Sequence, residues 1–176
     1  MARDLNGDCG GDPAEALLEW FAASPGRELL ERECACVEEL LGDLFGYYLL
    51  QVGCSRQFVD PVAHGRIRHH VALESRFPGL GGGSTVIGAD HAFPVAKDSV
   101  DVVFLPHALD FTADPHKVLR ESERVLIPEG RVIILGFNPW SLWGLWHLVR
   151  RRGGRLPWCG AFLGPRRVAD WLALLG

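Results

Sequence analysis

The sequence predicts an α/β fold, a Rossmann-like three-layer sandwich built around a mostly parallel sheet. Two apolar runs rich in β-branched residues, 100–105 and 131–136, flank a segment whose apolar residues recur at offsets of three and four. That spacing places Val118, Leu119 and Val125 on one helix face, so the order is strand, helix, strand. Continuous apolar strands joined by a helical crossover are typical of a parallel sheet that is covered on both faces.

The composition is that of one globular domain. The chain has 176 residues, of which 48% are hydrophobic and 23% are charged, and this is enough for a single core. Residues 1–11 are rich in Gly and Asp, so we expect a disordered tail there and one domain over 12–176. A net charge of −4 argues against a protein that binds nucleic acid with its whole surface.

Cysteine usage and hydropathy predict a cytoplasmic protein. The five cysteines are odd in number and irregularly placed, so we expect reduced thiols rather than disulfide bonds. No His or Cys cluster completes a metal site, and no metal is expected. No run approaches the roughly 18 apolar residues of a membrane span. The polar start, Met1–Asp8, lacks the apolar core of a signal peptide.

The expected elements follow in order along the chain. Asp12-Pro13 begins a helix that runs to about Ala23, and Ser24-Pro25 begins a second helix that ends between Gly42 and Gly46. Asp114-Pro115 begins the crossover helix over 115–127, and Pro128–Gly130 is a stop and turn. Strands are expected at 47–52, 67–73, 84–88, 100–105 and 131–136, a short helix from Phe58, and further helices at 141–147 and 168–175.

The second half of the chain resembles a known family. The motifs that carry the resemblance are Ala92–Pro94, Asp98–Val103, His107–Phe111, Asp114-Pro115, Leu119–Glu121, Arg124–Leu126 and Glu129–Arg131. Together they resemble class I S-adenosylmethionine (SAM) methyltransferases of the methyltransferase type 11 group, and Gly136–Leu145 is similar to their small proteobacterial YafS-like branch. The resemblance implies SAM as cofactor, S-adenosylhomocysteine as product, and a sheet in the order 3-2-1-4-5.

The resemblance assigns the methionine end of the cofactor to the turn after the first strand, at Gln51, Gly53, Cys54 and Ser55. Glycine there lets the backbone approach the cofactor closely, and a helix N-terminus helps to hold it. The chain departs from the family pattern, because Gln51 replaces an acidic residue and Ser55 and Gln57 replace two of three glycines. A plain strand-to-helix turn is the alternative interpretation.

Two acidic residues are candidates for binding the nucleoside part of the cofactor. Glu74 follows the glycine turn by about 20 residues, the spacing at which an acid binds ribose hydroxyls, and a surface glutamate is the alternative. In the family, an acid after the third strand accepts a hydrogen bond from the adenine amino group. This implies Asp90, although Ala89 can also be aligned there, and His91 or Phe93 would stack on adenine.

His107 is the candidate catalytic residue. It follows the fourth strand, whose last residues Leu105 and Pro106 are expected to border the cofactor, because ligands bind beyond strand ends in open α/β sheets. With an ordinary pKa of about 6.5, a histidine can take a proton from a methyl acceptor. The alternative is that His107 only packs or hydrogen-bonds at the wall of the site.

Surfaces outside the cofactor turn suggest partners. The segment 140–167 carries Trp140, Trp143 and Trp146 followed by several arginines, which suits a membrane surface, an apolar substrate or nucleic acid. A helix packed over the sheet is the commoner explanation. Class I methyltransferases normally add two more strands after the fifth strand. Without them the expected fifth strand, 131–136, has an open edge, which predicts either a fragment or a homodimer that pairs through this edge.

Methyl transfer from SAM to an unknown acceptor is the leading functional hypothesis. In the family that the chain resembles, N-terminal helices cap the cofactor site, so the resemblance implies this role for the helices that begin at Asp12-Pro13 and Ser24-Pro25. The alternative is that these helices only cover the sheet. A degenerate, non-catalytic binding module of the same fold is the second hypothesis, favoured by Gln51, Ser55 and Gln57. A different nucleotide-type ligand in the same crevice is the third, because fold alone does not determine function.

Overall fold

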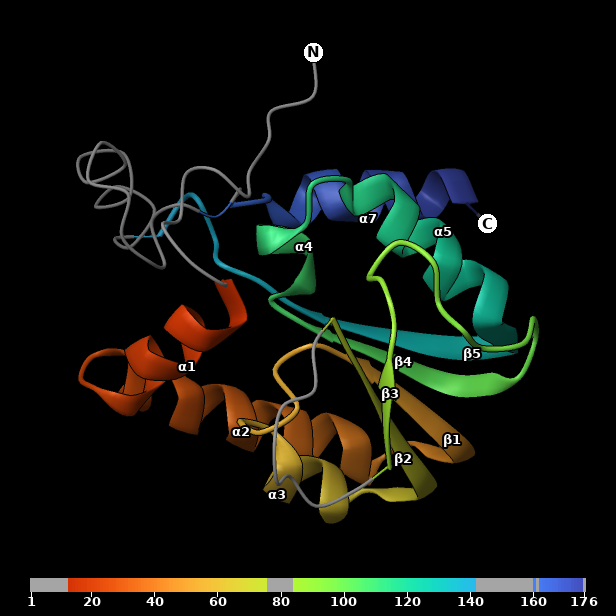
Figure 1. Ribbon diagram of the computed structural model, residues 1–176, viewed down its shortest axis with the longest axis horizontal. Helices are drawn as coiled ribbons and strands as arrows, with labels where there is room; N and C mark the ends of the chain where they lie inside the picture. Colours follow the sequence, from red (N-terminus) through yellow and green to blue (C-terminus); the bar gives the residue numbers. More distant parts are fainter. Residues whose placement is uncertain (1–12, 76–83, 142–159, 161, 176) are drawn as a thin grey trace.

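The computed structural model describes residues 13–75, 84–141, 160 and 162–175, and its centre is a parallel sheet (Figure 1). The five strands are β1 (Phe45–Val52), β2 (Arg66–Glu74), β3 (Ser84–Ile87), β4 (Val100–Pro106) and β5 (Leu126–Leu135). They lie in the order β3-β2-β1-β4-β5, and all neighbouring pairs are parallel. The predicted fold class and strand order are therefore confirmed.

Helices cover both faces of the sheet (Figure 1). One face carries α1 (Pro13–Ala22), α2 (Gly26–Gly42) and α3 (Val59–Ala63), and the other carries α4 (Ala108–Phe111), α5 (Pro115–Val125) and α7 (Pro165–Leu175). No helix within the described ranges is long and apolar enough to cross a membrane.

The core has two parts because side chains alternate across a strand. Leu50, Val103 and Leu105 pack with residues of α5, whereas Leu49 and Phe104 point to the opposite face and pack with α2. All five are at most 2% exposed. Both faces of β1 and β4 are thus buried, which explains why these strands are continuous apolar runs rather than alternating ones.

The crossover helix begins as predicted and ends earlier. The Asp114 side chain accepts a hydrogen bond from the Lys117 backbone N–H at 3.2 Å and caps α5. The helix ends at Val125, and the expected stop at 128–130 is an irregularity within β5 instead. From the pair Val100–Leu126 to the pair Val102–Arg131, β4 advances by two residues (102 − 100) and β5 by five (131 − 126). The register of the two strands therefore shifts at this point, where β5 bulges.

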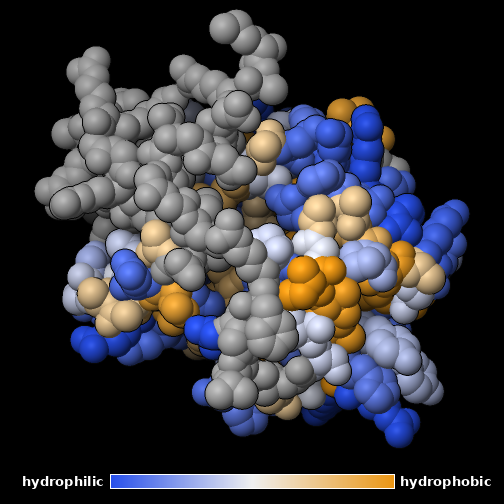
Figure 2. Space-filling view, viewed as in Figure 1, coloured by the Kyte–Doolittle hydropathy of each residue, from blue (hydrophilic) through white to orange (hydrophobic). Residues whose placement is uncertain are grey.

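Several details differ from the sequence-based expectation. The short helix α4 was not expected, and α7 begins at Pro165 rather than at 168. The helix expected at 141–147 and the arginines that follow it lie outside the described residues. Figure 2 shows a hydrophobic patch where Figure 1 places β3, whose last residue, Ile87, is 49% exposed at the edge of the sheet.

Candidate functional site

The turn after β1 has the left-handed backbone that the glycine pattern predicts. Gly53 has a φ of 76° and Cys54 a φ of 50°, and the Gly53 N–H donates to the Leu73 carbonyl at 2.9 Å. Among the described residues other than Gly53 and its two chain neighbours, no atom lies within 4 Å of the position that a Cβ on Gly53 would occupy. The turn therefore needs glycine for its backbone angles, and the space beside it is open.

Gln51 holds this turn from inside the protein. It is 0% exposed, and its Nε2 donates to the carbonyls of Gly53 at 3.1 Å and Cys54 at 3.0 Å. Burial lowers the pKa of His70, so a neutral His70 ring donates from Nε2 to Gln51 Oε1 at 2.9 Å. A carboxylate at position 51 has no proton to donate to the two carbonyls. Replacement of the family's acid by glutamine thus has a local structural reason.

Glu74 links the ends of β1 and β2. Its Oε1 accepts a hydrogen bond from the Ser55 backbone N–H at 2.9 Å, and the residue is 9% exposed. Its Oε2 receives no hydrogen bond from any residue in the described part of the chain. One carboxylate oxygen therefore fixes the turn, and the other has no hydrogen-bond donor among the described residues. The structure brings together Gly53, Cys54, Ser55 and Glu74 from the predicted set.

Asp90 and His91 lie at the tip of a tight turn after β3. Ala89 and Ala92 form an antiparallel bridge, with the Ala92 N–H donating to the Ala89 carbonyl at 3.2 Å. The side chains of Asp90 and His91 are 42% and 55% exposed and lie 3.0 Å apart. Phe93 is only 4% exposed and belongs to the core, so His91 is the exposed ring of the two proposed for stacking.

The last two residues of β4 present little side-chain surface. Leu105 is 0% exposed and lies in the core. Leu105 and Pro106 pair with Ile134 and Leu135 of β5. Any contact that these two residues make with a ligand would involve the backbone at the end of the strand.

His107 is buried between two carboxylates. It is 1% exposed; Nδ1 lies 3.2 Å from Asp110 Oδ2 and Nε2 lies 3.2 Å from Glu33 Oε2. Burial disfavours the charged ring, but hydrogen bonds to Asp110 and Glu33 outweigh it and raise the pKa of His107 to about 9. The raised pKa favours the charged ring at neutral pH, and both ring nitrogens are engaged. This geometry favours the alternative role at the site wall, and the catalytic role stays a prediction.

Known proteins are similar to the part of the chain that carries the turns described above. Residues 50–134 match the model of a methyltransferase domain family. This stretch of the chain is therefore similar to a methyltransferase domain. The matched residues run from near the end of β1 to the penultimate residue of β5 and include the turns at Gly53 and Asp90. The expected resemblance to methyltransferases is thus confirmed over this stretch, and the strand order confirms the expected fold.

Two known proteins are similar in sequence to this chain. The chain is 34% identical over 169 residues to an uncharacterised protein, YafS, of Escherichia coli K12, covering 96% of this chain and 64% of that protein. The chain thus spans less than two thirds of this relative. It is 42% identical over 52 residues to malonyl-[acyl-carrier protein] O-methyltransferase of Halorhodospira halophila, 30% of this chain and 18% of that enzyme.

Solved structures share the fold. A SAM-dependent methyltransferase of Thermotoga maritima superposes with a TM-score of 0.70 at 18% identity, covering 90% of this chain and 74% of that one. At this level of identity the similarity concerns the fold alone. It agrees with the five-stranded order found here.

Sequence reasoning missed two partners of His107. Asp110 follows His107 by three residues, a spacing at which side chains in and beside a helical turn can meet. Glu33 comes from α2, and its distance along the chain left no signal in the sequence. Phe137 completes the cluster, with its ring centroid 4.4 Å from that of His107 and its N–H donating to Asp110 at 3.0 Å. Through Glu33, α2 reaches the carboxyl ends of β4 and β5.

A separate cavity lies between β5 and α7. It has a volume of about 500 Å³ and is mainly apolar, with Asp110 and Asn138 as its polar members. Its lining is Leu109, Asp110, Val132, Ile134, Leu135, Gly136, Asn138, Leu163, Pro165, Val168, Ala169 and Leu172. It contains none of the predicted cofactor residues, so it is distinct from the turns at Gly53 and Asp90.

Proposed function

We propose that this domain binds SAM at the carboxyl ends of β1, β2 and β3 and transfers its methyl group to an acceptor. The observation that carries the proposal is the meeting of three features within the family-matched stretch. They are the left-handed turn at Gly53, the carboxylate of Glu74 and the turn that carries Asp90. Parallel strands bring these features to one edge of the sheet, where open α/β sheets bind ligands.

The residues present fit the parts of SAM that they would hold. The open space beside Gly53 suits close approach of the methionine part to the backbone of Gly53 and Cys54. Glu74 offers Oε2 to the ribose hydroxyls, because Oε1 already accepts the Ser55 N–H. Asp90 offers a partly exposed carboxylate to the adenine amino group, and His91 lies beside it.

The chemistry requires positioning more than covalent participation by the protein. Bound SAM supplies a methyl group that its sulfonium charge already makes reactive. Holding an acceptor in line with that methyl group can supply about 7–11 kcal/mol at best. Because His107 is a buried cation, its proposed place is beside the acceptor region, where it ties α2 to the ends of β4 and β5. A proton acceptor is needed only for acceptors that must lose a proton.

A non-catalytic binding module is the second candidate, and one observation favours it. The Gln51 side-chain amide is fully engaged, because its nitrogen donates to two carbonyls of the turn and its oxygen accepts from His70. No carboxylate from that position therefore reaches the charged end of a cofactor. Such a module would keep the turns without methyl transfer.

Calorimetric titration of SAM and S-adenosylhomocysteine into the purified chain tests the proposal. We expect micromolar binding that is about tenfold weaker, but still measurable, in Asp90→Ala, because the variant removes the predicted acceptor for the adenine amino group. Asp43→Ala is the matched control, since Asp43 is an exposed aspartate at the end of α2, two residues before β1 and at the other end of that strand from the Gly53 turn. Absence of binding by the wild-type chain would refute the proposal. Binding without transfer to any class of acceptor would favour the binding module.

A further inference from the structure

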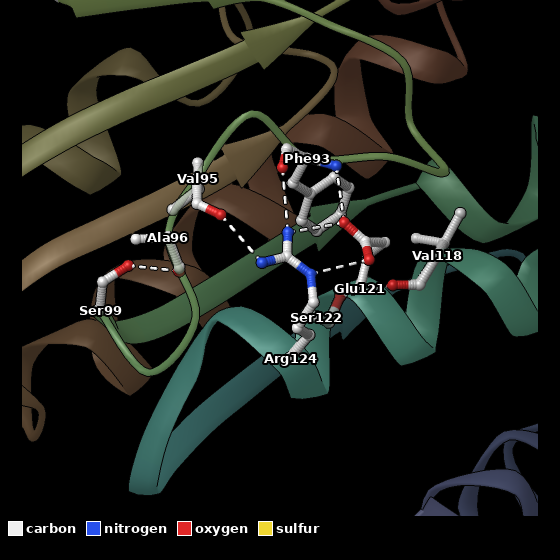
Figure 3. Close-up of polar contacts among 8 residues, drawn as sticks. All are labelled: Phe93, Val95, Ala96, Ser99, Val118, Glu121, Ser122 and Arg124. Atoms are coloured by element: carbon white, nitrogen blue, oxygen red, sulfur yellow. Dashed lines mark hydrogen bonds and ion pairs between the residues drawn. The ribbon is translucent and has the colours of Figure 1, made fainter.

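The segment that joins β3 to β4 is held by α5. The Phe93 N–H donates to Glu121 Oε2 at 2.8 Å. The Phe93 carbonyl accepts from Arg124 Nη2, and the Val95 carbonyl accepts from Arg124 Nη1, both at 3.0 Å (Figure 3). Two side chains of one helix therefore fix both polar backbone groups of Phe93 and one of Val95.

Glu121 and Arg124 also fix each other. Arg124 Nε donates to Glu121 Oε1 and Arg124 Nη2 donates to Glu121 Oε2, each at 2.8 Å. The hydrogen bond from Arg124 holds the pKa of Glu121 below its ordinary range. A planar guanidinium can serve the carboxylate and two carbonyls at once, whereas a lysine ammonium on its flexible stem cannot reproduce this fork. We refer to this pair with its three backbone contacts as the Glu121–Arg124 clasp.

The clasp determines where the Asp90 turn can lie. On one side, the Gly88 N–H donates to the Glu74 carbonyl at 3.0 Å. On the other side, Phe93 is anchored twice, by its backbone in the clasp and by its ring in the core. The short turn between these two anchors carries Asp90 at its tip. Releasing Phe93 would let that tip move without any change in the tip residues.

We propose that Glu121 and Arg124 are positioning residues for the nucleoside part of the ligand. They hold the 89–92 turn so that the Asp90 carboxylate is already placed when the ligand arrives. This inference rests on the proposed function, since it concerns the same site. The clasp contacts main-chain atoms of the segment, so it sets the backbone path whatever side chains the tip carries. Binding then avoids the entropy cost of ordering the turn.

The test compares Arg124→Lys and Glu121→Gln with two matched controls on the same helix. The controls are Arg120→Lys and Glu123→Gln, which change exposed residues outside the clasp. The first readout is the Kd of the full chain for S-adenosylhomocysteine. We expect about a tenfold rise for Arg124→Lys, the size of effect that loss of charge-assisted hydrogen bonds produces. The controls should bind like the wild-type chain.

The second readout separates positioning from general support of the fold. In an Asp90→Ala background, Arg124→Lys should weaken binding no further, because the clasp acts through the Asp90 turn. Wild-type affinity in Arg124→Lys, or an undiminished further loss in the Asp90→Ala background, would overturn the proposal.

The third readout is hydrogen exchange at the Phe93 amide, which needs no ligand. Exchange should become faster at Phe93 in both clasp variants and stay slow at core amides of β4. If the wild-type chain binds no S-adenosylhomocysteine, the proposed function fails by itself. Exchange at Phe93 then decides alone whether the clasp holds the turn, and unchanged exchange would show that it does not.

Discussion

The buried cluster of Glu33, His107 and Asp110 makes the stability of the fold depend on pH, and substitution of its two carboxylates should remove that dependence. The perturbation is the double variant Glu33→Gln, Asp110→Asn. It keeps side chains of similar size and removes the two hydrogen-bonded carboxylates that raise the pKa of His107. Burial alone would then act on the ring and lower its pKa.

The expected magnitude follows from the raised pKa. His107 has a pKa of about 9 in the folded protein against 6.5 ordinarily, which corresponds to about 3 kcal/mol. Because the folded pKa is the higher one, this stabilisation is fully present below pH 6.5 and is lost as pH rises through 9. Between pH 7.5 and 9.5 the wild-type chain should lose about 2 kcal/mol of unfolding free energy. The double variant should lack this contribution and lose less stability than the wild-type chain, because its His107 is already neutral there.

Urea unfolding at pH 7.5, 8.5 and 9.5 measures both slopes. Burial lowers the pKa of His70, so that group does not titrate in this window. Burial raises the pKa of the Cys54 thiol from 9.0, so the unfolded chain ionises there first and Cys54 lowers stability near pH 9.5 in both proteins. The difference between the two slopes therefore measures His107. His64→Asn is the control, because His64 has a side chain that is 67% exposed, and its variant should keep the wild-type slope. A wild-type unfolding free energy that is flat from pH 7.5 to 9.5 would refute the charged state of His107.

Two further predictions concern the cofactor turn and the sheet edge. Gln51→Glu should lower the unfolding free energy by about 3 kcal/mol, because it leaves two carbonyls without a donor and buries a carboxylate. It should not improve SAM binding, and a gain in affinity measured by calorimetry would contradict the role assigned to Gln51. The possible homodimer through the β5 edge stays a proposal, for which light scattering after size exclusion should give twice the chain mass. A monomer over the whole concentration range would count against it.

The fold could be predicted because its signals are local. The apolar spacing of 115–125, the cap at Asp114 and the uniform strands β1 and β4 each depend on neighbours within a few residues. The irregularity in β5 was missed for a related reason. Pro128–Gly130 has the composition of a turn, and only the pairing with β4 shows that the chain continues as a strand around Glu129, whose φ is 70°.

The site was harder to predict because its polar contacts join distant parts of the chain. Glu33 lies 74 positions before His107, and Gln51 is 19 positions before His70. Neither pair has a spacing rule that a single sequence could display. Gln51 was recognised as a departure from the family pattern and His107 as a titratable group at a strand end, but their roles depend on partners that only the fold supplies. The ordinary pKa of a histidine suggested proton transfer, and the sequence did not reveal the two carboxylates whose hydrogen bonds raise that pKa.

Contacts to the main chain near the proposed cofactor site bear on the choice between a methyltransferase and a non-catalytic binding module. The structure holds each segment near the proposed cofactor through its main chain. Gln51 binds the carbonyls of the Gly53 turn, Glu74 binds the Ser55 N–H, and the Glu121–Arg124 clasp binds Phe93. A turn held in this way can keep its backbone path with fewer glycines, because hydrogen bonds from neighbouring side chains stabilise that path. Loss of glycines and of the acid at position 51 therefore does not by itself favour a non-binding domain. Binding measurements on Asp90 and Arg124 variants carry more weight than the motif.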